Sequence, residues 1–201
     1  VTGISHELRT PLNSILGYAQ ILEYDPQIPE HRRDAVTVIR RSSEHLASLV
    51  DGLLDLAKIE SGKLQLDNEE LRFVEFMSQI VGMFRLQAQN KGIAFDYDTQ
   101  GRLPRVIRAD KKRLGQILIN ILGNAVKFTE RGTVSLRVRA RNEIVIFEIR
   151  DSGAGISADE LERIFLPFER GASASVTSES GTGLGLSIAR MLTNLMGGEM
   201  T

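Results

Sequence analysis

The sequence has no cysteine, no strong net charge and no long run of apolar residues. Without cysteine, the chain forms no disulfide framework, no cysteine-ligated zinc site and no thiol nucleophile. Its 25 basic and 26 acidic residues give a formal charge of −1, which argues against a general nucleic-acid binder. No segment approaches the roughly 18 consecutive apolar residues of a membrane span, and the N-terminus lacks the layout of a signal peptide. These absences predict a soluble chain that makes no membrane contact.

The 201 residues divide into two parts of different character. The chain is long for one minimal domain and short for two full ones of about 150 residues each. Its composition, 42% hydrophobic and 25% charged, is that of an ordinary globular protein and excludes disorder over most of the chain. Residues 1–70 carry 7 basic and 12 acidic residues, a balance of −5, whereas residues 71–201 carry 18 and 14, a balance of +4. We therefore expect two domains, at 1–62 and 63–201, because Gly62 follows the last helical turn of the first part.

The first part has the pattern of a helical hairpin. Apolar positions between Ile4 and Leu22 alternate by three and four, which is the stripe of an amphipathic helix. Pro26 and Pro29 break this helix, and a second stripe runs over residues 36–57. Two helices that each expose a long seam do not bury both seams against each other alone. We therefore expect an antiparallel hairpin that forms a dimeric four-helix bundle, with an intramolecular hairpin lying on the second domain as the alternative.

Beyond residue 63, helix and strand patterns are mixed, which predicts a layered α+β domain with helices packed over a sheet. Residues 132–141 alternate apolar and polar side chains, as a half-buried strand does. Residues 144–149 are apolar at nearly every position, so we expect a central strand, covered on both sides or in the middle of the sheet. Residues 171–180 are almost all small or polar and predict a mobile loop. The other expected elements are helices at 71–89, 110–128 and 184–196 and a strand at 93–99.

The first segment with chemical character is Ser5–Leu12, which reads SHELRTPL. On a helix, His6 lies about 200° around the axis from the buried stripe and therefore faces solvent. A hydrogen bond from one ring nitrogen to Glu7 would fix the tautomer and leave the other nitrogen a better nucleophile. Thr10 shares the face of His6, and Pro11 leaves the carbonyl of Glu7 without its helical donor. Taken alone, an exposed histidine without function is the simpler interpretation.

The second segment runs from Asn120 to Thr129. Asn120 and Asn124 lie one turn apart on the same helix face, and Lys127 falls close to Asn124 on that side. Two amide oxygens and a cation fit a magnesium-triphosphate site, because Mg²⁺ takes few protein oxygens and keeps phosphate and water ligands. Solvated polar residues are the alternative interpretation.

Two glycine-rich segments follow. Asp151 comes directly after the apolar strand and precedes Gly153 and Gly155. A carboxylate at this place can accept a hydrogen bond from an exocyclic amine, while the bare glycine backbone approaches the flat ring that carries the amine. Aspartate and glycine are also common turn residues, which is the alternative for this segment. Gly181–Leu186, GTGLGL, opens the last expected helix, where backbone N–H groups point at an anion. It lacks both the preceding strand of a dinucleotide-binding unit and the Gly-Lys-Ser/Thr end of a P-loop, so phosphate binding alone is predicted.

Taken together and in order, these segments resemble the catalytic core of the sensor histidine kinases of two-component signalling. The similarity covers nearly the whole chain. It implies a dimeric hairpin that presents a phospho-accepting histidine, followed by an α/β sandwich of the Bergerat type, the ATP-binding fold shared with gyrase and heat-shock chaperones. The similar segments are Ser5–Leu12 (H box), Asn120–Thr129 (N box), Asp151–Ile156 (first glycine box), Phe165–Phe168 (F box) and Gly181–Leu186 (second glycine box).

The resemblance also implies roles for single residues. His6 would accept the phosphoryl group, and Glu7 would be its hydrogen-bonding partner and general base. Asn124 would ligate Mg²⁺, and Asn120 would line the same site. Residues 171–180 would form the ATP lid. The remaining implied nucleotide contacts are Lys127 and Arg170 to phosphate, Asp151 to the adenine amine, and Gly153, Gly155, Gly181, Thr182, Gly183, Leu184 and Gly185 around the pocket.

The function implied by the resemblance is Mg-ATP-dependent autophosphorylation of His6, followed by phosphoryl transfer to an aspartate of a response regulator receiver domain. The homodimer would be cytoplasmic, as part of a bacterial-type sensor that can itself be attached to the membrane. ATP-hydrolysing relatives carry a glutamate at the position of Asn120, and asparagine cannot act as a base, which favours transfer over hydrolysis. The E-x-x-T pattern from Glu7 to Thr10 implies a regulator phosphatase activity as well. Two alternatives stay open, namely an ATP hydrolase that acts as a conformational clamp and a non-catalytic dimerisation module.

The chain departs from the family pattern at both ends. It stops at residue 201, where the family normally adds a final pair of strands, and it starts five residues before His6, where the first helix is usually well under way. We therefore expect an incomplete sheet with an exposed edge and a smaller buried core.

Overall fold

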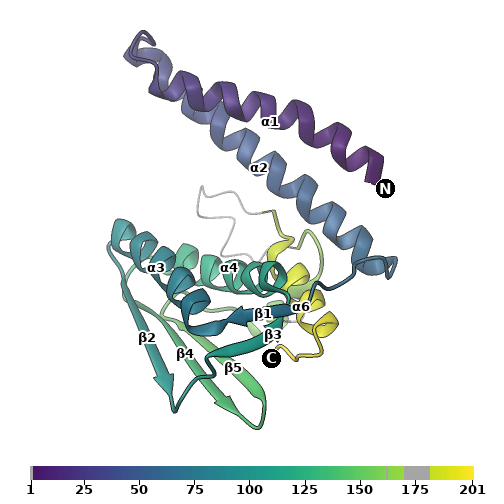
Figure 1. The fold of residues 1–201 in the computed structure, drawn as a ribbon. Coiled ribbons are helices and arrows are strands. Elements are labelled where there is room, and N and C mark those ends of the chain that lie inside the picture. The colour runs from purple at the N-terminus through teal and green to yellow at the C-terminus, as the bar shows by residue number, and fades with distance from the viewer. Residues whose placement is uncertain (1, 162, 170–181) are drawn as a thin grey trace. The chain divides into compact units, whose positions relative to one another are not determined.

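The computed structural model describes residues 2–161, 163–169 and 182–201, with the side chains of residues 2–6 left out. The chain divides into two compact units. The first comprises Val1–Leu64 with Ser178–Leu184, and the second comprises Gln65–Thr177 with Gly185–Thr201. Figure 1 shows a helical hairpin in the first unit and helices over a sheet in the second. The expected two-domain α+β class is therefore confirmed.

The hairpin consists of α1 (Thr2–Tyr24) and α2 (Glu30–Glu60). Helix α1 continues through Pro11, and the two helices are separated at the predicted proline-containing break, where the backbone N–H of Gln27 donates to Asp25. Helix α2 ends at Glu60, and Gly62, which follows its last turn as expected, adopts a left-handed φ of 65°. In the following turn, the N–H groups of Lys63 and Leu64 both donate to the carbonyl of Lys58.

The seam between α1 and α2 buries only part of the apolar surface of the hairpin. Leu12 and Ala19 of α1 are buried, as are Val36 and Leu56 of α2. A second set of large apolar side chains on the same helices stays exposed. This set comprises Leu8, Ile15, Tyr18, Ile21, Leu22, Tyr24, Val38, Ile39, Leu46 and Leu53. One hairpin thus leaves an apolar face uncovered within its own unit, as the long predicted stripes require.

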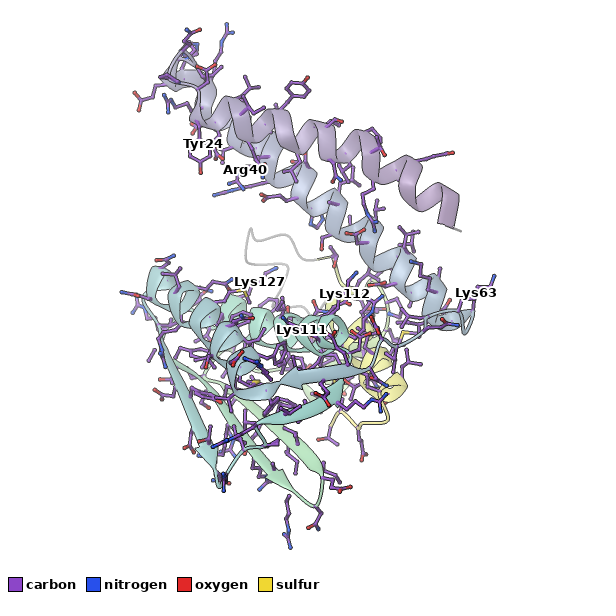
Figure 2. All side chains as sticks on the ribbon, in the orientation of Figure 1. Tyr24, Arg40, Lys63, Lys111, Lys112 and Lys127 are labelled. Atoms are coloured by element: carbon purple, nitrogen blue, oxygen red, sulfur yellow. The ribbon has the colours of Figure 1, made fainter. Side chains whose placement is uncertain are left out.

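Ion pairs between the helices fix their alignment. Arg9 of α1 pairs with Asp51 of α2, with Nη2 2.6 Å from Oδ1. Arg40 of α2 lies 2.8 Å from Glu23 of α1 and 2.6 Å from Glu44 one turn along its own helix. The carboxylates of Glu44 and Glu23 raise the pKa of the Arg40 guanidinium. Arg40 and Tyr24 lie toward the loop end of the hairpin (Figure 2). The Arg9–Asp51 pair is exposed and contributes little stability, so it serves mainly to define the register of the hairpin.

The second unit contains two small sheets and three longer helices. Strands β1 (Glu69–Arg72) and β3 (Val106–Ala109) form an antiparallel pair. The larger sheet has the order β2-β4-β5, with β2 (Ala94–Gln100) parallel to β4 (Thr133–Arg141) and β4 antiparallel to β5 (Ile144–Asp151). The helices are α3 (Phe73–Lys91), α4 (Lys111–Phe128) and α6 (Gly185–Leu195), with a short α5 (Ala158–Leu161) and a 3₁₀ turn, η1 (Arg163–Phe165).

The core lies between the larger sheet and helices α3 and α4, which cover one face of that sheet (Figure 1). Every second residue of β4 points into this layer, and Val134, Leu136 and Val138 have no exposed surface. Phe73 and Phe84 of α3 are buried on the opposite side, as are Leu118 and Leu122 of α4. This two-layer packing holds α4, the helix with the N-box residues, rigidly against the sheet.

Three sequence predictions differ from the structure. Residues 69–72 form strand β1, so the helix expected from residue 71 begins at Phe73, and Leu71 is a buried strand residue. Strand β3 was not predicted. Strand β5, expected to be central, pairs with β4 alone among the described residues and is an edge strand. Its apolar run is misleading because Ile144 and Ile146 face outward. The loop expected at 171–180 lies outside the described residues.

Candidate nucleotide and phospho-acceptor site

The H-box segment lies in the first half of α1. Glu7 and Thr10 are exposed there, and the hydroxyl of Ser14 donates to the backbone carbonyl of Thr10 at 3.1 Å. Arg9, between them in sequence, is the residue that pairs with Asp51 of α2. His6 lies in α1, but its side chain is outside the described part of the structure. The hydrogen bond expected between His6 and Glu7 therefore stays a prediction.

The N-box residues lie on α4. The predicted apolar face of this helix is confirmed, since Leu118, Leu122 and Ala125 are buried. Asn120 and Asn124 are half-buried. The amide nitrogen of Asn120 donates to the backbone carbonyl of Gly185 at 3.0 Å, which leaves its amide oxygen as an acceptor. Among the described residues, none forms a hydrogen bond with the Asn124 side chain.

The end of α4 is held by two groups that sequence reasoning missed. The ammonium group of Lys91, at the end of α3, donates to the backbone carbonyls of Val126 and Lys127. The buried hydroxyl of Thr129 donates to the carbonyl of Ala125 at 2.8 Å. The Lys91 bonds satisfy two carbonyls of the last helical turn, and the Thr129 hydroxyl adds a second donor to the Ala125 carbonyl, which already accepts from the Thr129 N–H. They fix the turn that carries Asn124 and Lys127, whose ammonium group lies 5.3 Å from the Phe128 ring centroid.

The first glycine box follows directly on β5 and abuts the end of α4. Asp151 is exposed, and its Oδ1 accepts a hydrogen bond from the N–H of Gly153 at 2.9 Å. A β-carbon on Gly153 would lie 2.6 Å from the carbonyl oxygen of Phe128, so only glycine fits at this close approach. Gly155 has a φ of 74°, a left-handed conformation that glycine adopts without strain. The loop therefore places the Asp151 carboxylate beside the last turn of α4.

Ser152 anchors the same loop to the start of β4. Its hydroxyl accepts from the N–H of Thr133 at 2.9 Å, and its own N–H donates to the carbonyl of Thr133. A β-carbon on Gly132, where φ is 109°, would lie 2.2 Å from this hydroxyl. The Ser152 hydroxyl thus holds the loop in one position, which the sequence pattern alone did not indicate.

The second glycine box is described only from residue 182 onward. Gly183 has a left-handed φ of 70°, and Leu184 is 1% exposed. The hydroxyl of Thr182 accepts from the N–H of Leu184 at 3.3 Å. Gly185 begins α6, and its carbonyl accepts from Asn120. The N box and the helix end of the second glycine box therefore meet, as expected for one site, whereas Gly181 and Arg170 lie outside the described residues.

The F box is connected to α6 by one ring contact. The guanidinium carbon of Arg190 lies 4.9 Å from the Phe165 ring centroid, within the range of a cation–π interaction. This contact positions η1 against the helix that Gly185 begins.

These residues fit a nucleotide that binds as its magnesium complex. In the part of the chain that the structure describes, no three His, Cys, Asp or Glu side chains gather to hold a metal ion. The donors on α4 are amide oxygens and a lysine, which suit Mg²⁺ bound mainly through phosphate oxygens. A cavity of about 1050 Å³ lies between β3 and the β4–β5 turn, and none of the N-box or glycine-box residues lines it. The nucleotide assignment thus rests on the motif residues and their mutual contacts.

Two known domain families match most of the chain. Residues 1–62 match the His Kinase A (phospho-acceptor) domain, and residues 109–201 match the Histidine kinase-, DNA gyrase B-, and HSP90-like ATPase. The chain belongs to the sensor histidine kinases. In the described part of this histidine kinase, no helix is both long enough and apolar enough to cross a membrane.

Named relatives agree with this family. The histidine kinase chain is 39% identical over 203 residues to the aerobic respiration control sensor protein ArcB of Escherichia coli K12, covering 100% of the chain and 26% of ArcB. It is 36% identical to the autoinducer 2 sensor kinase/phosphatase LuxQ of Vibrio parahaemolyticus, covering 98% of the chain and 24% of LuxQ. The crystal structure of full-length ShkA with AMPPNP has a TM-score of 0.78 and 38% identity, covering 98% of this chain and 40% of ShkA. The chain thus spans about a quarter of the length of these curated relatives.

Proposed function

We propose that the chain is the kinase core in which Mg-ATP phosphorylates His6 and the phosphoryl group then passes to an aspartate of a response regulator. The observation that carries the nucleotide half is the hydrogen bond from Asn120 to Gly185, which joins the N box to the second glycine box. The similarity to ShkA, whose structure contains AMPPNP, supports ATP as the nucleotide. The match of residues 1–62 to a phospho-acceptor domain supports His6 as the acceptor.

Each nucleotide contact follows from the chemistry of its residue. Asp151 has one carboxylate oxygen bonded to Gly153, and the other accepts from the adenine amine. Lys127 neutralises phosphate charge. Asn124 would contribute its amide oxygen to Mg²⁺, with Asn120 one helical turn away. Mg²⁺ held by Asn124 and the nucleotide would supply positive charge that neutralises the charge developing during phosphoryl transfer.

The pocket is completed by backbone. We assign Gly153 and Gly155 to the loop under the adenine and the segment Gly181–Gly185, with Thr182 and Leu184, to the phosphates at the start of α6. Arg170 and residues 171–180 are assigned to the lid over the nucleotide.

On the hairpin, we assign His6 as nucleophile and Glu7 as the base that accepts its proton. Asn120 stands where hydrolysing relatives carry a glutamate, and an amide does not remove a proton from water. Bound ATP is therefore protected from hydrolysis until His6 reaches the γ-phosphoryl group. Thr10 positions water for a second activity, removal of phosphate from the regulator.

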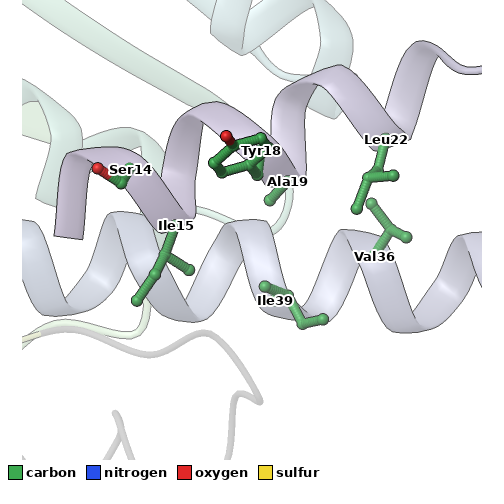
Figure 3. Close-up of a pocket in the computed structure, with 7 residues that line it drawn as sticks. All are labelled: Ser14, Ile15, Tyr18, Ala19, Leu22, Val36 and Ile39. Carbon is green, nitrogen blue, oxygen red and sulfur yellow. The ribbon is translucent and has the colours of Figure 1, made fainter. Parts of the chain in front are cut away.

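We assign the exposed face of the hairpin to a homodimer. A shallow apolar groove on this face is lined by residues of both helices, among them Ile15, Tyr18 and Ile39 (Figure 3). A second hairpin that packs there completes a four-helix bundle and buries the exposed seam. We take residues 1–62 as this dimerisation and phospho-acceptor domain and residues 63–201 as the catalytic domain, in a cytoplasmic part of the whole protein.

Incubation with Mg²⁺ and γ-labelled ATP tests the function. A histidine kinase gives acid-labile, base-stable label on the protein, since phosphoramidates hydrolyse in acid. Released phosphate without labelled protein would instead identify an ATP hydrolase that acts as a clamp. If neither label nor phosphate is found, the chain is a dimerisation module that has kept the fold.

A further inference from the structure

The linker that follows the hairpin is short because hydrogen bonds fix it on both sides. On the hairpin side, the N–H of Leu64 donates to the carbonyl of Lys58 at 3.2 Å, and Leu64 is buried. On the catalytic side, the N–H of Asp67 donates to Oδ2 of Asp110 at 3.0 Å. Only Gln65 and Leu66 lie between the two anchoring bonds.

Asp110 is a buried carboxylate with both oxygens engaged. It is 6% exposed and lies between β3 and α4. Its Oδ1 accepts from the N–H of Arg113 at 2.9 Å, which caps the start of α4. Its Oδ2 accepts from Asp67. Serine and asparagine cap helices as well as aspartate does, so capping alone does not require a carboxylate. A second acceptor oxygen is what the linker bond requires.

The linker bond extends the pairing of β1 with β3. In that ladder Glu69 lies opposite Ala109, and Asp67 and Asp110 follow at the same end. The chain that leaves the hairpin is thereby fixed to Asp110, the N-cap of the helix that carries Asn120 and Asn124. No other side chain among the described residues donates to or accepts from the backbone of residues 65–68.

We propose that Asp110 is a positioning residue that couples the linker to the nucleotide-binding helix α4 and so limits the reach of the catalytic domain toward His6. This inference rests on the proposed kinase function. With the Asp110 bond, the free tether consists of Gln65 and Leu66 alone. Without this bond, the tether extends over residues 65–68, up to the start of β1 at Glu69. Each added residue extends the reach by up to about 3.6 Å.

The expected consequence is specific to the transfer step. The residues assigned to ATP lie in the catalytic domain and keep their positions when the linker is released. Transfer between two tethered domains depends on the effective concentration and orientation that the tether allows. A looser tether therefore lowers the rate of transfer from bound ATP and leaves ATP binding unchanged.

Two substitutions release the linker from opposite sides. Asp67→Pro removes the donor N–H without touching Asp110. Asp110→Ser keeps an oxygen for the cap of α4 but offers no second oxygen to the linker. The matched control is Asp67→Ala, which keeps the N–H and removes only an exposed side chain. If Asp110→Ser fails to fold, Asp67→Pro tests the proposal alone.

Initial rates of His6 labelling are measured against ATP concentration in each variant, with a fluorescent ATP analogue to measure affinity directly. We expect Asp67→Pro and Asp110→Ser to lower kcat about tenfold, the loss typical of one hydrogen bond to a charged group. KM and analogue affinity should stay within about twofold of the unchanged chain. Asp67→Ala should match the unchanged chain, and the double variant should be no slower than either single one.

An unchanged kcat in Asp67→Pro would overturn the proposal, and so would a raised KM, because the substitution would then distort the ATP site. Multiplying losses in the double variant would do the same, because the two residues would act independently. Failure of the proposed function is a separate result, since the unchanged chain would then carry no label on His6.

Discussion

Asn120 of α4 donates a hydrogen bond of 3.0 Å to the carbonyl of Gly185, the first residue of α6. The two residues are 65 positions apart, and the bond joins the helix assigned to the metal with the helix whose start is assigned to phosphate. A β-carbon on Gly185 would meet the Asn120 amide oxygen at 3.5 Å, an ordinary contact. The side-chain amide of Asn120, more than the small size of Gly185, therefore defines how these two helices meet.

Asn120→Asp should weaken this junction because it replaces a donor with a carboxylate that faces a carbonyl. We expect a loss of about 1–3 kcal/mol in the free energy of unfolding of the catalytic domain. Labelling from ATP should fall as well. Thermal unfolding and labelling rates measure both, with Asn194→Asp on the exposed part of α6 as the control. Equal stability of the two variants would contradict the assigned role of the bond.

Gly153→Ala should be disruptive because its β-carbon would lie 2.6 Å from the Phe128 carbonyl and 2.8 Å from the Asp151 carboxylate. We expect destabilisation of about 1–3 kcal/mol and weaker ATP binding, since the Asp151 loop must move. Gly82→Ala on α3 is the matched control, because its β-carbon meets nothing within 4 Å. That control should gain about 0.5–1 kcal/mol. Denaturant unfolding measures the stability of both variants, and nucleotide titration measures their affinity for ATP. Equal stability and affinity of the two alanine variants would contradict the role given to the close approach at Gly153.

The hairpin residue Ile15, 49% exposed in the groove of Figure 3, tests the assigned dimer. Ile15→Glu places a charge in the seam that the partner hairpin would bury, so it should shift the dimer toward monomer. Light scattering after gel filtration measures the mass. The control is Gln20→Glu, at an exposed polar position on α1, and this variant should still have the mass of a dimer. A monomeric unchanged chain, or a dimeric Ile15→Glu, would show that this face has another use.

Thr10→Ala separates the two activities assigned to the H box. Thr10 is exposed on α1. Because the threonine is assigned to water and not to ATP, the variant should keep autophosphorylation and lose at least about tenfold in dephosphorylation of a phosphorylated regulator. Rates of both reactions are measured on the same preparation. A parallel fall in both would mean that Thr10 has no separate role.

Local signals predicted much of the fold. The break around Pro26 and Pro29, the helix end just before Gly62 and the inward-facing residues of β4 all follow from neighbouring residues. The second half of strand β1, Leu71 and Arg72, was assigned to a helix because the four residues of this strand become a strand only by pairing with β3. The run in β5 predicted burial, but an apolar sequence does not reveal how many strands flank it.

Some residues of the candidate site were likewise predicted from the sequence, and others were found only in the structure. Motif order alone selected Asn120, Asn124 and Asp151, and the structure brings the N box together with both glycine boxes. Lys91 and Asp110 escaped notice because their partners lie 35 and 43 residues away in sequence. A lysine at a helix end and an aspartate before a helix are common, and only the folded backbone shows what each one holds.

The position of the phosphoryl group tests the central claim most directly. The sequence contains three histidines, His6 in α1 and His31 and His45 in α2, so the last two are internal controls. After incubation with Mg²⁺ and γ-labelled ATP, the label is located by mass spectrometry under alkaline conditions. Our account predicts label on His6, its loss in His6→Gln, and its retention in His31→Gln and His45→Gln. Label that persists in His6→Gln, or that lies on His31 or His45, would contradict it.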